Sequence, residues 1–166
     1  ATATAAAAVP PLQSLLRRAD IRVLQAAVSS LSAINDPSAE RALHTVLKAA
    51  TGDARAAVIS SLTGMKDARV VPMLVRVLQD SDPFGDEFTL ILDTLAALAA
   101  MRDDRAIPQV TALARKKRWL AWGRTTRARD AALQTLKTIG TAKARDAIAD
   151  LAKTGDFFLR RMAARA

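Results

Sequence analysis

Residues 115–129 combine two kinds of side chain that bind anionic partners. The stretch holds seven basic residues and no acidic one, and it contains both tryptophans of the chain. Lysine and arginine neutralise phosphates, while tryptophan stacks on nucleobases or lies at a lipid headgroup layer. The candidate binding residues are therefore Arg115, Lys116, Lys117, Arg118, Trp119, Trp122, Arg124, Arg127 and Arg129.

The positive charge of the chain is concentrated in its C-terminal part. The net charge is +9. Residues 102–166 hold 16 Lys and Arg against 6 Asp and Glu, a balance of +10, whereas residues 1–101 hold 9 against 10, a balance of −1. This asymmetry predicts an anionic partner for one end of the protein.

The same basic stretch also has a purely structural interpretation. Four consecutive basic residues at the end of a helix complement its negative dipole, and Trp119 and Trp122 could fill space between helices. Arg127 and Arg129 fall near a predicted helix N-terminus, where cations are disfavoured, which indicates a function or an acidic neighbour. Packing, binding of nucleic acid or another polyanion, and docking of an acidic protein segment or a membrane surface all stay open.

The residue types argue against catalysis and against metal binding. The chain has no cysteine and one histidine, His44, so thiolate sites, a Cys nucleophile and His-based zinc sites are excluded. Six scattered glycines form no phosphate-binding loop, and no Ser-His-Asp set can be proposed. The acidic connection at residues 80–87 lacks EF-hand ligand spacing. We predict a non-enzymatic protein with no cofactor and no metal site.

Composition favours helices. Hydrophobic residues make up 51% of the chain and aromatic residues only 4%, so the apolar residues are mainly Ala, Leu, Val and Ile. Alanine is the strongest helix former. No apolar run approaches the roughly 18 residues that a membrane span requires. The first residues lack the basic region of a signal peptide. We expect an all-α protein in the cytoplasm.

A helical pattern recurs four times along the chain. The four similar segments occupy residues 28–36, 59–67, 95–103 and 133–141, offset by 31, 36 and 38 residues. Apolar residues within each segment step by three, as on one face of an amphipathic helix. A polar turn and a second apolar stripe follow. One helix pair cannot bury its stripe alone, so neighbouring pairs must stack.

These helix pairs resemble the HEAT repeats. The resemblance rests on Asp-x-Arg openings at residues 20–22 and 53–55, on Ile139-Gly140 closing a first helix, and on second-helix openings at 69–74 and 105–110. It implies a right-handed α-solenoid of about four HEAT-like helix-turn-helix repeats with partial terminal helices. The predicted repeats cover about residues 20–52, 53–83, 84–123 and 124–155, with a partial repeat at 156–166, within a domain at 10–166 after an Ala-rich linker or terminus at 1–9. The predicted helices are 10–19, 21–34, 38–50, 54–65, 69–80, 87–101, 105–118, 126–139, 143–154 and one from 157.

The resemblance also implies a function, because HEAT proteins are mostly scaffolds and adaptors. We expect a protein-binding scaffold that uses a solenoid groove lined by second helices. The alternative is binding of nucleic acid or another polyanion through residues 115–129. A third interpretation is an internal part of a longer repeat protein. HEAT-like alkylpurine DNA glycosylases use basic surfaces with Trp and Asp, but no such pocket can be placed here by spacing.

Overall fold

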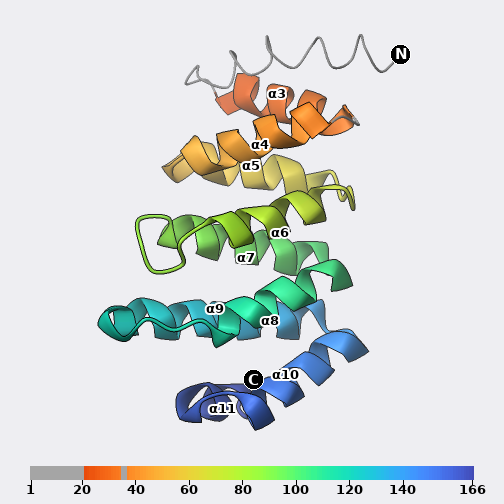
Figure 1. Cartoon of the computed structure of the whole chain (residues 1–166). Coiled ribbons are helices and arrows are strands. Elements are labelled where there is room, and N and C mark those ends of the chain that lie inside the picture. The colour runs from red at the N-terminus through yellow and green to blue at the C-terminus, as the bar shows by residue number, and fades with distance from the viewer. Residues whose placement is uncertain (1–20, 35–36) are drawn as a thin grey trace. The chain divides into compact units, whose positions relative to one another are not determined.

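The computed structural model is all-helical and describes residues 21–34 and 37–166. Within these ranges it contains nine α-helices, two short 3-10 helices and no strand (Figure 1). The predicted all-α class is therefore confirmed. The predicted linker at residues 1–9 and helix at 10–19 lie outside the described residues. The described residues fall into two compact units, a first unit that ends at Met73 and a second unit that begins at Leu74.

In the described part of the first unit, one helix packs against two others. Its described elements are α3 (Ile21–Ala33), α4 (Pro37–Ala49), α5 (Gly52–Gly64) and the beginning of α6 (Val70–Asp80). Helix α3 packs against both α4 and α5. The core of this unit contains fully buried aliphatic side chains, among them Val28, Leu31, Leu47, Val58 and Leu62.

The second unit contains the basic segment. Its elements after α6 are α7 (Phe88–Met101), η1 (Asp104–Ala106), α8 (Ile107–Arg115), η2 (Trp119–Ala121), α9 (Trp122–Ile139), α10 (Ala142–Thr154) and α11 (Phe157–Ala163). Helix α9 lies at the centre and contacts α7, α8, α10 and α11, while α8 also packs against α10. Four of the nine candidate binding residues lie on α9, namely Trp122, Arg124, Arg127 and Arg129, and the other five precede it.

The predicted apolar register is confirmed at the position that all four segments share. Leu31, Leu62, Leu98 and Leu136 are each 0% exposed. Their common burial shows that the three-residue stripe read from the sequence faces the core of its own unit. Full burial of a leucine contributes roughly 1.5–3 kcal/mol of transfer free energy.

The turn that follows α5 has the same backbone conformation as the turns that follow α7 and α9. Lys66, Arg102 and Gly140 occupy the corresponding positions, with φ angles of 50°, 50° and 70°. This left-handed conformation ends the helix, because it lets the backbone N–H bond back to the last turn. The N–H of Arg102 donates to the Leu98 carbonyl at 3.2 Å, and that of Gly140 donates to the Leu136 carbonyl at 3.1 Å.

The polar residues after this turn repeat their bonding as well. Asp67 accepts a hydrogen bond from the backbone N–H of Arg69 at 2.9 Å, and Asp103 accepts one from that of Arg105, also at 2.9 Å. In both turns the arginine Nε also donates to the aspartate carboxylate. These bonds explain why an acidic residue starts the turn into the second helix.

Two helix boundaries around the basic segment were predicted wrongly. Helix α8 ends at Arg115 rather than at residue 118, because Lys116 adopts an extended conformation with ψ 143°. Helix α9 begins at Trp122 rather than at residue 126. The Thr125 hydroxyl lies 3.2 Å from both the backbone nitrogen and the carbonyl oxygen of Arg118, which ties the preceding connection to the first turn of α9. The other boundaries within the described residues agree to within two residues.

Candidate functional site

All six aromatic residues of the chain stand around the starts of three helices in the second unit. They are Phe84 and Phe88 at α7, Trp119 and Trp122 at α9, and Phe157 and Phe158 at α11. Only Phe88 is buried. The aromatic residues therefore contribute little to the core. They lie at or just before the N-termini of α7, α9 and α11.

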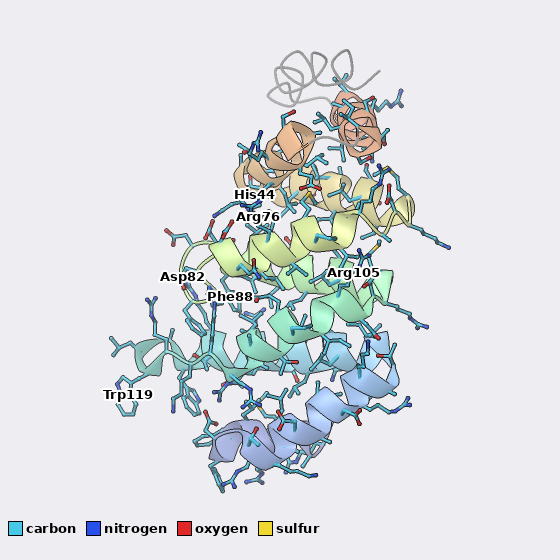
Figure 2. All side chains as sticks on the ribbon, turned by 45° about the vertical axis from the view of Figure 1, so that its right-hand side comes forward. His44, Arg76, Asp82, Phe88, Arg105 and Trp119 are labelled. Carbon is cyan, nitrogen blue, oxygen red and sulfur yellow. The ribbon has the colours of Figure 1, made fainter. Side chains whose placement is uncertain are left out.

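The exposed large hydrophobic residues form what we call the apolar patch: Trp119, Leu120, Trp122, Phe157 and Phe158. Trp119 is 88% exposed and Leu120 is 90% exposed. Figure 2 shows the labelled Trp119 side chain projecting away from the ribbon. The interpretation that Trp119 fills space between helices is therefore wrong.

The remaining aromatic side chains of the patch pack against one another. The rings of Trp122 and Phe158 lie 4.7 Å apart at an interplanar angle of 81°, and those of Phe157 and Phe158 lie 5.4 Å apart at 85°. Such edge-to-face pairs are favourable beyond the area that they bury. Trp122 and Phe158 are still about half exposed, at 52% and 51%. These three packed rings, Trp122, Phe157 and Phe158, form what we call the floor of the patch, and the outer face of the patch is exposed to solvent.

A cavity of about 310 Å³ opens beside this aromatic pair, between α9 and α11. Its wall includes Trp122, Phe158 and the Met162 side chain. Three arginines also line it: Arg161, Arg165 and Arg129, the last of which is paired with Asp156. The cavity therefore offers apolar surface for a side chain next to the charges of Arg161 and Arg165.

Two of the nine predicted binding residues form ion pairs with the last helices. Nη2 of Arg115 lies 2.6 Å from Oδ2 of Asp150 and 2.9 Å from the hydroxyl of Thr154. Arg129 is buried, and its Nη2 lies 2.6 Å from Oδ2 of Asp156. Asp156 is therefore the acidic neighbour that offsets the charge of Arg129.

Arg118 bridges the basic segment to the acidic connection before α7. Its Nη1 lies 3.3 Å from Oδ2 of Asp82, and its guanidinium carbon lies 6.0 Å from the centre of the Phe84 ring. Both partners of the ion pair are about half exposed, so the pair contributes little to stability. The ion pair instead helps to position the basic connection beside residues 82–84.

Arg124 and Arg127 are held at the same connection. Nη1 of Arg124 donates to the carbonyl oxygens of Phe84 at 2.7 Å and Gly85 at 3.0 Å. Both guanidinium groups lie over the Phe88 ring, at 5.9 Å for Arg124 and 5.5 Å for Arg127. Cation–π contacts of this kind are worth about 0.5–1 kcal/mol at exposed sites.

The structure therefore separates the nine candidates by their partners. The five arginines have contacts within the protein, and two tryptophans belong to the apolar patch. Lys116 and Lys117 are exposed, and their side chains make no hydrogen bond or ion pair within the described part of the chain. On and after α11, the side chains of the exposed residues Arg160, Arg161 and Arg165 are in the same state.

The acidic groups beside the patch are already engaged. The hydrogen bond from Arg129 holds the pKa of Asp156 below its ordinary value of 3.8, although burial opposes this shift. The backbone N–H of Phe84 is the main cause of the lowered pKa of Asp82. Both carboxylates stay charged at neutral pH. Each is bonded to an arginine, and the nearby charge of Lys117 also lowers the pKa of Asp156.

Sequence reasoning missed the contribution of Leu120, Phe157 and Phe158. A usable signal exists, because aromatic residues recur about 35 to 38 residues apart: Trp119 and Trp122 follow Phe84 and precede Phe157 by that spacing. Where helical repeats stack, side chains at the same position of each repeat lie along the same edge of the stack, so this spacing is a signal for a shared surface.

The other candidate residues form no site. In the acidic connection, Asp82 accepts a hydrogen bond from the backbone N–H of Phe84 at 2.9 Å, and Glu87 accepts one from that of Asp82 at 3.0 Å. These two carboxylates thus bond to the backbone of the connection itself. Across residues 21–34 and 37–166, no three His, Asp or Glu side chains gather as metal ligands. His44 lies on α4, in the first unit.

No protein-family model and no curated protein sequence matches the chain. In the described part of the protein, no helix has the length and apolar character needed to cross a membrane.

Proposed function

We propose that the chain is a non-enzymatic, protein-binding module built from HEAT-like repeats that stack as an α-solenoid. Helix contacts inside the second unit support the stacking: α7 packs along α9, and α8 packs against α10, so first helices meet first helices and second helices meet second helices. The recurring left-handed turn at Lys66, Arg102 and Gly140 supports the repeat. A solenoid of this kind offers an extended surface for a partner.

The apolar patch carries the functional part of the proposal. All five large hydrophobic side chains that are exposed in the described residues belong to it. Clustered exposed hydrophobics on a folded protein mark interaction surfaces, and Trp is among the residues that dominate binding energy at interfaces. The patch lies at the starts of first helices, so we place the binding site there rather than along a groove of second helices.

Polyanion binding remains a second candidate, because five free cations lie in the connection before α9 and on and after α11: Lys116, Lys117, Arg160, Arg161 and Arg165. A second observation reduces its weight. Arg115, Arg118 and Arg129 are paired with carboxylates, so fewer charges are free for phosphates. We therefore rank it below protein binding.

The test is site-specific photo-crosslinking in cells that naturally produce the protein. A photoreactive residue replaces Leu120, and in a matched control it replaces Gln134, an exposed residue of α9. We expect adducts of defined mass from position 120 that protease removes and nuclease does not, and few adducts from position 134. Nuclease-sensitive adducts would favour the polyanion alternative. Equal adduct patterns from both positions would show that the patch is not the binding site.

A further inference from the structure

We propose that the apolar patch and the free cations around it bind one class of partner, an acidic protein segment that carries apolar side chains. This inference rests on the proposed function and deepens it, because it names the chemistry of the bound segment. Three observations support it: the form of the cavity, the charge around the patch and the character of the exposed side chains.

The cavity between α9 and α11 fits an apolar anchor. Its volume of about 310 Å³ exceeds the roughly 150 Å³ that admits a benzene-sized group. Trp122, Phe158 and Met162 supply ring and thioether surface. Methionine adapts its shape to different partners, so the cavity suits a Leu, Met or Phe side chain. An anchor buried here would contact the floor of the patch directly.

The charge around the patch requires acidic residues beside that anchor. Arg161 and Arg165 line the cavity, and Lys116 and Lys117 lie in the connection that leads to Trp119. None of the four has an ion-pair partner within the described residues. The nearby carboxylates are held by arginines: Asp82 by Arg118, Asp150 by Arg115 and Asp156 by Arg129. The surface is therefore positive, and acidic residues in the partner complement it.

The same observations disfavour two other occupants. A second copy of this chain that docked through the same patch would bring its own positive charge, and like charges facing each other at an interface are costly. Nucleic acid would use the cations and the Trp119 ring, but Leu120 has no π-face on which a base can stack. Leu120 is nevertheless the most exposed side chain of the patch, at 90%. An aliphatic residue displayed in this way fits an apolar side chain of a protein.

The tryptophans allow binding to be measured without a label. The chain has no tyrosine, and its two tryptophans both belong to the patch. Trp emission of the full chain is titrated with synthetic peptides in which leucine and phenylalanine alternate with glutamate. Matched peptides carry glutamine or lysine in place of glutamate, and a single-stranded DNA oligonucleotide serves as a polyanion without apolar side chains. We expect a blue shift and reduced acrylamide quenching with the glutamate peptides alone.

Variants then locate the binding. Affinity for the glutamate peptides, measured by anisotropy of labelled peptide, should fall roughly tenfold or more in Leu120→Ala and in Phe158→Ala. Arg161→Glu should weaken binding by a similar factor. The matched control is Lys137→Glu, which makes the same charge change at an exposed position in the last turn of α9. That variant should bind within about twofold of the unchanged protein.

Each contrary result has a defined meaning. Equal affinity for glutamate and glutamine peptides would overturn the requirement for acidic residues. Tighter binding of the oligonucleotide, lost in Arg161→Glu, would replace the proposed partner with nucleic acid. A blue shift that grows with protein concentration alone would identify a second copy as the occupant. If no peptide binds while residue 120 still crosslinks to protein, this inference is wrong and the proposed function stands.

Discussion

The guanidinium of Arg129 is buried against the carboxylate of Asp156, with Nη2 and Oδ2 2.6 Å apart and the Arg129 side chain only 4% exposed. The same carboxylate accepts a hydrogen bond from the backbone N–H of Leu159 at 3.0 Å, which caps α11. One aspartate therefore joins α9 to the start of α11. Because Phe157 and Phe158 belong to that first turn, this ion pair holds two residues of the apolar patch in place.

Asp156→Asn separates the ion pair from the cap, because asparagine caps helices as well as aspartate does. We expect the free energy of unfolding to fall by roughly 1–3 kcal/mol, since the buried guanidinium of Arg129 loses its charged partner. Urea denaturation provides the measurement. The exposed pair of Asp82 and Arg118 serves as the control, and Asp82→Asn should cost less than about 1 kcal/mol. An Asp156→Asn cost no larger than the control's would contradict the account of the buried pair.

The pKa of Asp156 predicts the direction of acid destabilisation. Its folded-state pKa is held below the ordinary 3.8, chiefly by the hydrogen bond from Arg129. A carboxyl with a depressed folded-state pKa stabilises the fold above the unfolded-state pKa, and that contribution is lost as pH falls through the folded-state pKa. Unfolding free energy should therefore decline below about pH 4, and less steeply in Asp156→Asn. If the free energy of unfolding falls equally steeply at low pH in both proteins, Asp156 does not cause the acid destabilisation.

The stripe of leucines predicts a contrast between two identical truncations. Leu98 is 0% exposed, so Leu98→Ala should lower the free energy of unfolding by about 2–5 kcal/mol. Leu120 is 90% exposed, and Leu120→Ala should change it by less than about 0.5 kcal/mol. Thermal or urea unfolding of both variants measures the difference. A Leu98→Ala cost below about 0.5 kcal/mol would mean that the register is wrong.

The recurring turn predicts that removing a glycine at one position lowers the free energy of unfolding, whereas introducing a glycine at the equivalent position raises it. Gly140 has a φ of 70°, and an added Cβ would meet its nearest neighbour, the Lys137 carbonyl oxygen, at an ordinary 3.5 Å. Gly140→Ala should therefore destabilise by about 1–2 kcal/mol through backbone strain alone. Arg102, with a φ of 50°, should gain up to about 1 kcal/mol in Arg102→Gly. Calorimetry of both variants tests this, and changes of the same sign would contradict a shared turn.

The two tryptophans should differ in their solvent exposure. Trp119 is 88% exposed, whereas Trp122 is 52% exposed and packs on Phe158. Trp119→Phe leaves only the more shielded indole, so emission should shift to shorter wavelength and acrylamide quenching should fall. Trp122→Phe should do the reverse. If both single-Trp proteins quench equally, the outward orientation of Trp119 is incorrect.

Local sequence features predicted the helices, since they depend on local physics. Apolar steps of three predicted the faces that bury Leu31, Leu62, Leu98 and Leu136. The failures fall at the connection before α9. There the end of α8 and the start of α9 depend on the bonding of Thr125 to the backbone of Arg118, seven residues earlier. The spacing of apolar residues gives no information about a hydrogen bond of this kind.

The candidate site was only partly predictable for a similar reason. Charge density identified residues 115–129, but the number of basic residues does not reveal which of them have partners. Arg115, Arg118 and Arg129 are paired with aspartates 27 to 36 residues away in sequence. The apolar patch likewise depends on Phe158 meeting Trp122 across two helices. Both features come from packing rather than from sequence spacing.

The crosslink from position 120 tests the central claim most directly, because it asks what touches the patch in the cell. Comparing the unchanged background with Phe158→Ala adds the decisive control, since that variant removes the floor of the patch and leaves the crosslinking position intact. We predict nuclease-resistant protein adducts that weaken in Phe158→Ala and are scarce at position 134. Nuclease-sensitive adducts, or protein adducts of equal strength in all three proteins, would contradict the account.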